Sequence, residues 1–187
     1  MLGGNDMRTE KSTIKSEAVF SDDGKHRVLL SREWDKSKPS AMVIMINPNS
    51  ADTMICDTTT MLVINNLYKL GYGSMKIMNL YSMMTSKISF RFNADSDLNC
   101  AENDEYIKSV AKEVDVVILA WGSIGNNNTR IKERQKAVFE MLKPYSEKLK
   151  LISDAEGKKT FHPLAPQIRN SWNLIDFNYE EKENGTN

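Results

Sequence analysis

The sequence predicts an α/β protein with three layers, α/β/α, in which helices cover both faces of a mainly parallel central sheet of about four core strands. Two observations predict this class. Continuous apolar runs of strand length alternate with amphipathic segments of helix length, and a polar signature follows each run directly. Strands joined by helices of this length are connected by right-handed crossovers, which makes them parallel.

Each apolar run between turn signals predicts a strand that is buried on both faces. These runs are residues 41–46, 75–80, 115–121 and 149–153. Upstream of them, Asp22-Asp23-Gly24 lies between residues 18–20 and 26–31 and is a hairpin signal. The hairpin predicts antiparallel strands at the amino-terminal edge of the sheet.

Helices are predicted where apolar residues recur on one stripe. These segments are residues 58–70, 101–112 and 129–142. Asp57 precedes the first of them as an N-cap, and Gly71 follows it as a stop. The loop expected over residues 81–98 is longer than the usual limit of about 12 to 15 residues, which is itself a hint of function.

One domain is expected over residues 16–177, between a flexible amino-terminal segment, 1–15, and a flexible carboxyl-terminal tail, 178–187. No apolar run approaches the roughly 20 residues that span a bilayer and no signal peptide is evident. We therefore expect a soluble, cytoplasmic protein that does not bind membranes. The 25 basic and 25 acidic residues cancel, which removes the electrostatic argument for tight, non-specific binding of nucleic acid.

No metal site and no other cofactor is expected. Neither His26 nor His162 has a cysteine or carboxylate at ligand spacing, and Cys56 and Cys100 are expected to be reduced thiols. Basic residues gather within residues 129–142, but acidic residues interrupt them, so we expect a solvated helix face there.

Polar residues stand where the buried strands are expected to end. They are Asn47-Pro48, Asn79, Trp121-Gly122-Ser123 with Gly125, and His162-Pro163. Because ligands bind beyond the carboxyl ends of strands in open α/β sheets, we expect these residues to converge on one site. An amide reads donor and acceptor edges together, a histidine donates a proton or a hydrogen bond, and glycines let the backbone approach an anion closely. Asn49 and Ser50 extend the polar loop that would close over a ligand.

A structural interpretation stands beside each functional one. Asn47 can instead bond its own turn, Asn79 can pin the long loop that follows it, Trp121 can belong to the core, and His162 can be a packed structural histidine. Asp52 and Asp57 are candidate carboxylate bases, for which capping roles are at least as well supported.

Several blocks of the sequence are familiar in their order and spacing. They are residues 26–34, 45–52, 70–73, 79–81, 102–104, 120–122 and 161–164. Together they resemble the family called domain of unknown function 1643 over residues 25–166. This resemblance implies no particular activity.

The polar signatures are also similar, more remotely, to those of uracil-DNA glycosylases, which have a sheet flanked by helices, a Pro-containing water-activating motif, a base-reading asparagine, a Trp-Gly-Ser turn and a His-Pro loop. This resemblance implies a uracil-DNA glycosylase-like fold. It assigns water positioning to Asn47 and Pro48, base reading to Asn79, phosphate contact to the Gly122–Gly125 turn, and stabilisation of the departing base to His162. Asn47 stands where the best-known members have an aspartate, and the loop after His162 lacks their serine.

The resemblance and the residues together favour a domain that binds a nucleobase, nucleoside or nucleic acid and hydrolyses an N-glycosidic bond. Two alternatives stay open. A non-catalytic nucleotide-sensing or interaction domain would keep the pocket without a competent base, which Asn47 favours. A hydrolase of an unrelated small molecule would use Asp52 or Asp57 as its base.

Overall fold

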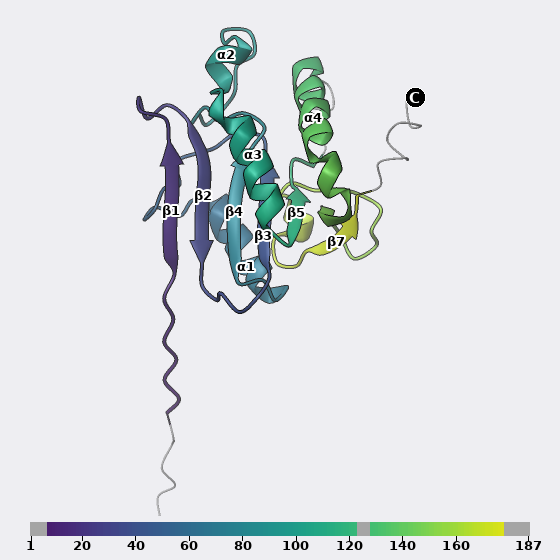
Figure 1. Ribbon diagram of the computed structural model, residues 1–187. Helices are drawn as coiled ribbons and strands as arrows, with labels where there is room; N and C mark the ends of the chain where they lie inside the picture. The colour runs from purple at the N-terminus through teal and green to yellow at the C-terminus, as the bar shows by residue number, and fades with distance from the viewer. Residues whose placement is uncertain (1–6, 123–127, 178–187) are drawn as a thin grey trace, which may run out of the picture.

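The computed structural model describes residues 7–122 and 128–177, which form a mixed α/β fold (Figure 1). The strands are β1 (Lys15–Phe20), β2 (Arg27–Glu33), β3 (Ser40–Met45), β4 (Ser74–Asn79), β5 (Val116–Leu119), β6 (Leu149–Ser153) and β7 (Asn173–Asp176). The α-helices are α1 (Thr58–Lys69), α2 (Asp95–Leu98), α3 (Glu102–Glu113) and α4 (Thr129–Leu142), and the 3-10 helices are η1 (Lys143–Lys148) and η2 (Pro166–Ile168).

Within the described residues these strands form a sheet in the order β1-β2-β4-β3-β5-β6-β7. The four inner strands β4, β3, β5 and β6 pair in parallel. The pairs at the two edges are antiparallel: β1 with β2, β2 with β4, and β6 with β7. The sheet is therefore mixed, which corrects the prediction of a mainly parallel sheet. The hairpin strand β2 continues the sheet from β4, and β7 returns along β6 without a crossover helix.

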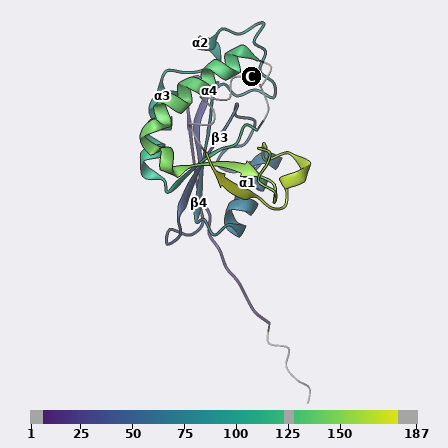
Figure 2. The ribbon, with the colours of Figure 1, turned by 90° about the vertical axis from the view of Figure 1, so that its right-hand side faces the viewer.

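Helices cover both faces of the sheet (Figures 1 and 2). Buried residues of α3 and α4 share one apolar cluster with one face of the strands, and residues of α1 share a second cluster with the other face. Alternate residues of β3 show this division, since Met42 and Ile44 belong to the first cluster whereas Val43 and Met45 belong to the second. The inner strands are buried on both faces, as their continuous apolar runs predict.

Local signals set the ends of α1 as the sequence predicts. The Asp57 carboxylate accepts a hydrogen bond from the backbone N–H of Thr60 at 2.8 Å and caps the amino end of the helix. Gly71 follows the helix with a φ of 87°, a conformation that favours glycine.

The predicted tails lie mostly beyond the described residues, since residues 1–6 and 178–187 are outside them. Lys15, assigned to the flexible segment, is instead the first residue of β1. None of the helices in residues 7–122 and 128–177 is long and apolar enough to cross a membrane.

The cap of α1 can be tested by substitution. We expect Asp57→Ala to lower the free energy of unfolding by about 1 kcal/mol, because the N–H of Thr60 loses its acceptor. Asp57→Ser should recover most of this loss, since serine also caps helices. Urea unfolding followed by circular dichroism measures both variants, and equal stability of Asp57→Ala and the wild type would contradict the capping role.

Candidate functional site

A cavity of about 280 Å³ lies where the polar signatures were expected to meet, beyond the carboxyl ends of the inner strands. We call it the carboxyl-edge cavity. It is lined by Ile46, Asn47, Ser86, Lys87, Ile88, Phe90, Ile131 and His162. Asn47 and His162, which are far apart in the sequence, therefore share one site. Ile131 comes from α4, and the lining residues between 86 and 90 come from the long loop after β4.

Among the described residues, the Asn47 side chain has one bonded polar atom, Nδ2, and one without a partner, Oδ1. Its Nδ2 donates to the carbonyl oxygen of Thr85 at 2.6 Å and to that of Pro48 at 3.2 Å, which is the turn bonding that the structural interpretation expects. Its Oδ1 accepts no hydrogen bond from the described residues. The side chain is partly buried and lines the cavity, so Oδ1 is available as an acceptor for a ligand or a water molecule.

Asn79 lies behind Asn47 rather than in the cavity. Its side chain is only 1% exposed and is absent from the cavity lining. With its amide nitrogen turned toward the neighbouring carbonyl groups, Nδ2 donates to Asn47 O at 3.2 Å and to Met78 O at 3.3 Å. The Asn79 amide is therefore not part of the cavity lining, and it contacts the backbone of Asn47, which is; base reading by Asn79 stays a prediction.

The Gly122 turn packs directly on the loop that carries His162. Gly122 has a φ of 59°, and a Cβ there would lie 2.6 Å from His162 N and 2.9 Å from Phe161 C. The predicted close approach is therefore to the chain's own backbone. Trp121 is 3% exposed and meets Phe139 edge-on at 5.4 Å, which places it in the core. Ser123 and Gly125 lie outside the described residues.

His162 is held as a neutral imidazole. The backbone N–H of Leu164 donates to Nδ1 at 3.2 Å, so Nδ1 is an acceptor and the ring proton sits on Nε2. Burial lowers the pKa of His162, which also favours the neutral ring. The site thus holds an N–H donor without a positive charge.

The loop after Pro48 does not enter the cavity lining. Asn49 and Ser50 are exposed, and Pro48 is buried with its carbonyl accepting from Thr85 N at 3.2 Å. Asp52 Oδ1 accepts from the backbone N–H groups of Met54 and Ile55, both at 2.7 Å. These Ile55 and Met54 hydrogen bonds hold the pKa of Asp52 below its usual value.

Two buried arginines bind the backbone of residues 51–53 in the same loop. Arg32 donates to the carbonyl groups of Asp52 and Thr53 at 2.6 and 2.8 Å, and Arg27 donates to that of Ala51. Asp52 and the helix cap Asp57 are therefore bound into structure away from the cavity, which does not favour either as its catalytic base.

The long loop after β4 contributes side chains to the cavity that were not predicted from the sequence. Lys87 and Phe90 line the cavity, and Lys87 is the charged side chain among the described lining residues. Arg130 of α4 fixes this loop by donating to Phe90 O at 2.8 Å and to Asn93 O at 3.0 Å, and by pairing with Asp95 at 2.5 Å. The unusual loop length was the one signal that pointed to these residues.

The basic residues of α4 do not form a purely solvated face. Besides the Arg130 contacts, Arg134 donates to Leu80 O at 2.7 Å and forms a bidentate ion pair with Asp104. Both arginines therefore brace the segment that follows β4, which corrects the prediction of a solvated face for these two side chains.

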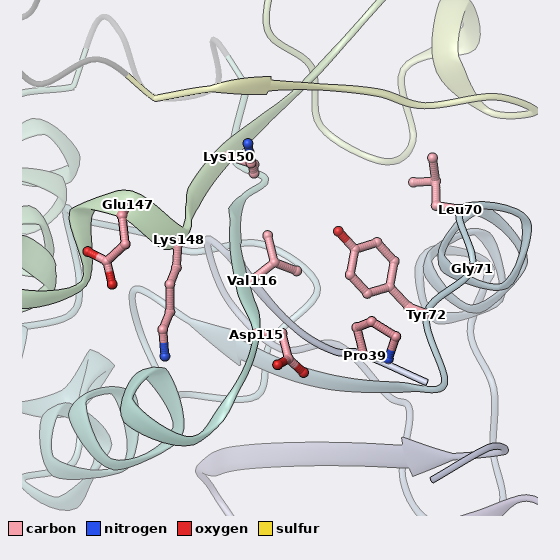
Figure 3. Close-up of a pocket in the computed structure, with 9 residues that line it drawn as sticks. All are labelled: Pro39, Leu70, Gly71, Tyr72, Asp115, Val116, Glu147, Lys148 and Lys150. Atoms are coloured by element: carbon pink, nitrogen blue, oxygen red, sulfur yellow. The ribbon is translucent and has the colours of Figure 1, made fainter. Parts of the chain in front are cut away.

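A second cavity, of about 310 Å³, lies at the amino ends of the inner strands, opposite the carboxyl-edge cavity. Figure 3 shows the residues that line it. Three of the ionic groups that line it have partners. Lys150 pairs with Asp176, Lys148 donates to Val114 O at 2.8 Å, and Asp115 accepts from Ser40 N at 2.7 Å. None of the candidate catalytic or ligand-binding residues predicted from the sequence is among the residues that line this cavity, so the carboxyl-edge cavity is the candidate site.

The fold and the cavity define a mixed α/β domain with a ligand-sized site beyond its parallel strands. Residues 27–164 match the family model described as protein of unknown function (DUF1643), and the chain belongs to this family. The matched region includes all the described residues that line the cavity. This confirms the family resemblance that the sequence blocks indicate. A comparison with curated proteins finds no match.

The contact between the Gly122 turn and the His162 loop can be tested with a matched glycine. Gly24 also has a positive φ, 69°, but a Cβ there would meet nothing within 4 Å. We expect Gly24→Ala to lower the free energy of unfolding by about 1 kcal/mol and Gly122→Ala to lower it by about 3 kcal/mol, because only the second adds a backbone clash. Chemical unfolding measures both values. Equal losses would show that the Gly122 contact is not tight.

The neutral state of His162 predicts a pH effect on stability. Because the folded-state pKa is lowered, the unfolded chain binds a proton that the native protein does not, so stability falls as the pH drops below the unfolded value. We expect the free energy of unfolding to fall as the pH drops below about 6.5, and to fall less in His162→Gln, which keeps an acceptor for Leu164 N. Urea unfolding at each pH measures this. Parallel pH profiles for the two proteins would contradict the assignment.

Proposed function

We propose that the carboxyl-edge cavity binds a nucleobase, either free or as part of a nucleotide or nucleic acid. The observation that carries this proposal is the lining: a phenylalanine ring, isoleucine side chains, an amide acceptor and a neutral imidazole donor surround a space of about 280 Å³. A nucleobase has a flat apolar face and a polar edge with donors and acceptors, which suits this combination.

The aromatic ring is held in place for stacking. Phe90 meets Tyr81 edge-on at 5.7 Å, and the Arg130 guanidinium lies over the Phe90 ring at 5.0 Å. The polar contacts would come from Asn47 Oδ1, which accepts from a base N–H, and from His162 Nε2–H, which donates to a base oxygen or nitrogen. Asn79 acts in this proposal as a positioning residue for Asn47.

Hydrolysis of an N-glycosidic bond is the second candidate function, and the uracil-DNA glycosylase-like arrangement belongs to it. Water held by Asn47 would attack the sugar carbon, the bonding electron pair would leave with the base, and His162 Nε2–H would stabilise the resulting negative charge. The proton that the water loses would end on the released base, which leaves as the neutral molecule. The neutral His162 donor favours this step. The described lining contains no carboxylate to take the proton from water, which favours binding without turnover.

The proposal can be tested by calorimetric titration with free bases, nucleosides and mononucleotides. We expect at least one of these to bind, and we expect Asn47→Ala and His162→Ala each to weaken binding about tenfold, because each removes a hydrogen bond inside the cavity. Tyr72→Phe, which alters the opposite cavity, is the control and should bind normally.

Mass spectrometry of the same mixtures separates the two candidate functions. Release of free base that depends on His162 would establish glycosidic hydrolysis, whereas saturable binding with no release would establish a sensor or interaction domain. Failure of every base, nucleoside and mononucleotide to bind would contradict the proposal, as would binding that both substitutions leave intact.

A further inference from the structure

The first part of the segment after β4, residues 81–93, is locally basic in a chain whose charges balance overall. Residues 81–93 contain Lys87 and Arg91 and no acidic residue. The same segment supplies Lys87 and Phe90 to the carboxyl-edge cavity, and it goes on to Phe92 outside the lining. Cations and aromatic rings thus alternate along the edge of the proposed base site.

Phe92 presents an aromatic face to solvent. Its side chain is 78% exposed, and the Arg91 guanidinium lies over its ring at 5.4 Å. Phe92 is two residues beyond Phe90, so their backbones are separated by at most about 7 Å. An exposed ring with a stacked guanidinium, this close to a cavity lined by a second ring, has the composition of a stacking platform for bases.

The exposure of Phe92 follows from how the loop is held. The backbone N–H groups of Phe92 and Asn93 donate to Ser89 O at 3.3 and 3.1 Å, which makes a tight turn. Arg130 fixes both sides of that turn through the carbonyl groups of Phe90 and Asn93. The turn is anchored, so the ring is presented before any ligand arrives, which reduces the entropy lost on binding.

We propose that this loop makes the protein a binder of single-stranded nucleic acid, an inference that rests on the proposed function. One base enters the carboxyl-edge cavity, the adjoining phosphates lie against Lys87 and Arg91, and the next base stacks on Phe92. The phosphates of a nucleic acid strand pair with Lys87 and Arg91 while one of its bases covers the Phe92 ring. An apolar protein partner would cover the ring but leave both cations unpaired. Bases in an intact duplex are already stacked on each other and are not free to cover Phe92.

The platform holds a short stretch of strand. Two cations neutralise about two phosphates, so the logarithm of the affinity should fall against the logarithm of the salt concentration with a slope of about −1.4. This weak dependence agrees with the balanced charge of the chain, which has 25 basic and 25 acidic residues.

The test is competition against a fluorescent single-stranded oligonucleotide, followed by anisotropy, with unlabelled strands of increasing length. We expect affinity to rise about tenfold or more from a mononucleotide to a trinucleotide and then to level off, since one further base stacks on Phe92. Phe92→Ala should remove most of that rise, because the further base loses its stacking partner while the phosphate contacts remain. Arg91→Ala should weaken trinucleotide binding and reduce the salt slope to about −0.7.

Tyr68→Ala is a matched control. Tyr68 is another exposed aromatic, 62% exposed with Lys38 over its ring at 5.7 Å, but it lies on α1 and lines no part of the carboxyl-edge cavity. This variant should bind every strand as the wild type does.

The outcomes separate this inference from the proposed function. A trinucleotide that binds no better than a mononucleotide, while mononucleotide binding still depends on His162, would overturn the platform and leave the proposed function standing. Tighter binding of a blunt duplex than of the single strand would overturn the single-strand assignment. Absence of binding by any nucleotide or strand would overturn both.

Discussion

Parallel pairing of β4, β3, β5 and β6 is the constraint from which the site follows. These strands are buried on both faces, and their register brings the segments that leave their carboxyl ends to one edge of the sheet. Two close contacts then fix the positions of Asn47 and the His162 loop at these strand ends. The Asn79 amide holds the backbone of Asn47, and Gly122 allows the loop of His162 to pack against the end of β5. The cavity is therefore built by backbone positions before any ligand is present.

The charges around this cavity favour a ligand that is neutral or negative. His162 contributes a donor without a charge, and Lys87 contributes a cation, while the carboxylate of Asp52, outside the cavity lining, is occupied by backbone N–H groups of its own loop. Arg130 and Arg134 do not extend this positive charge into a wider basic surface. Both bind carbonyl and carboxylate groups and so brace the long loop. Binding energy would thus come mainly from stacking and hydrogen bonds rather than from net charge.

Much of the fold could be predicted because its signals are local. Apolar runs and periodic stripes predict the inner strands and the three longer helices, and Asp57 predicts the start of α1. The edge strand β7 could not be predicted, because Asn173–Asp176 is short and half-exposed and becomes a strand only by pairing with β6. The short helix α2 has the same character, since four residues carry no periodicity. The antiparallel pair of β6 and β7 adds to the antiparallel amino-terminal edge that the hairpin signal predicted, and both edges make the sheet mixed.

The site was predictable in its place but not in its details. Strand ends indicated that Asn47 and His162 would meet, whereas the inward direction of Asn79 depends on packing between strands, and the partners of Arg130 lie 35 or more residues away.

The most direct measurement is ¹⁵N NMR of the two imidazole rings during titration with a nucleobase. We expect a neutral His162 with its proton on Nε2 whose resonances move on binding, while His26, bonded to Ser82 at 2.9 Å and outside the cavity, stays unchanged. A proton on Nδ1 of His162, or a bound base that leaves its resonances unmoved, would contradict the assignment of the site.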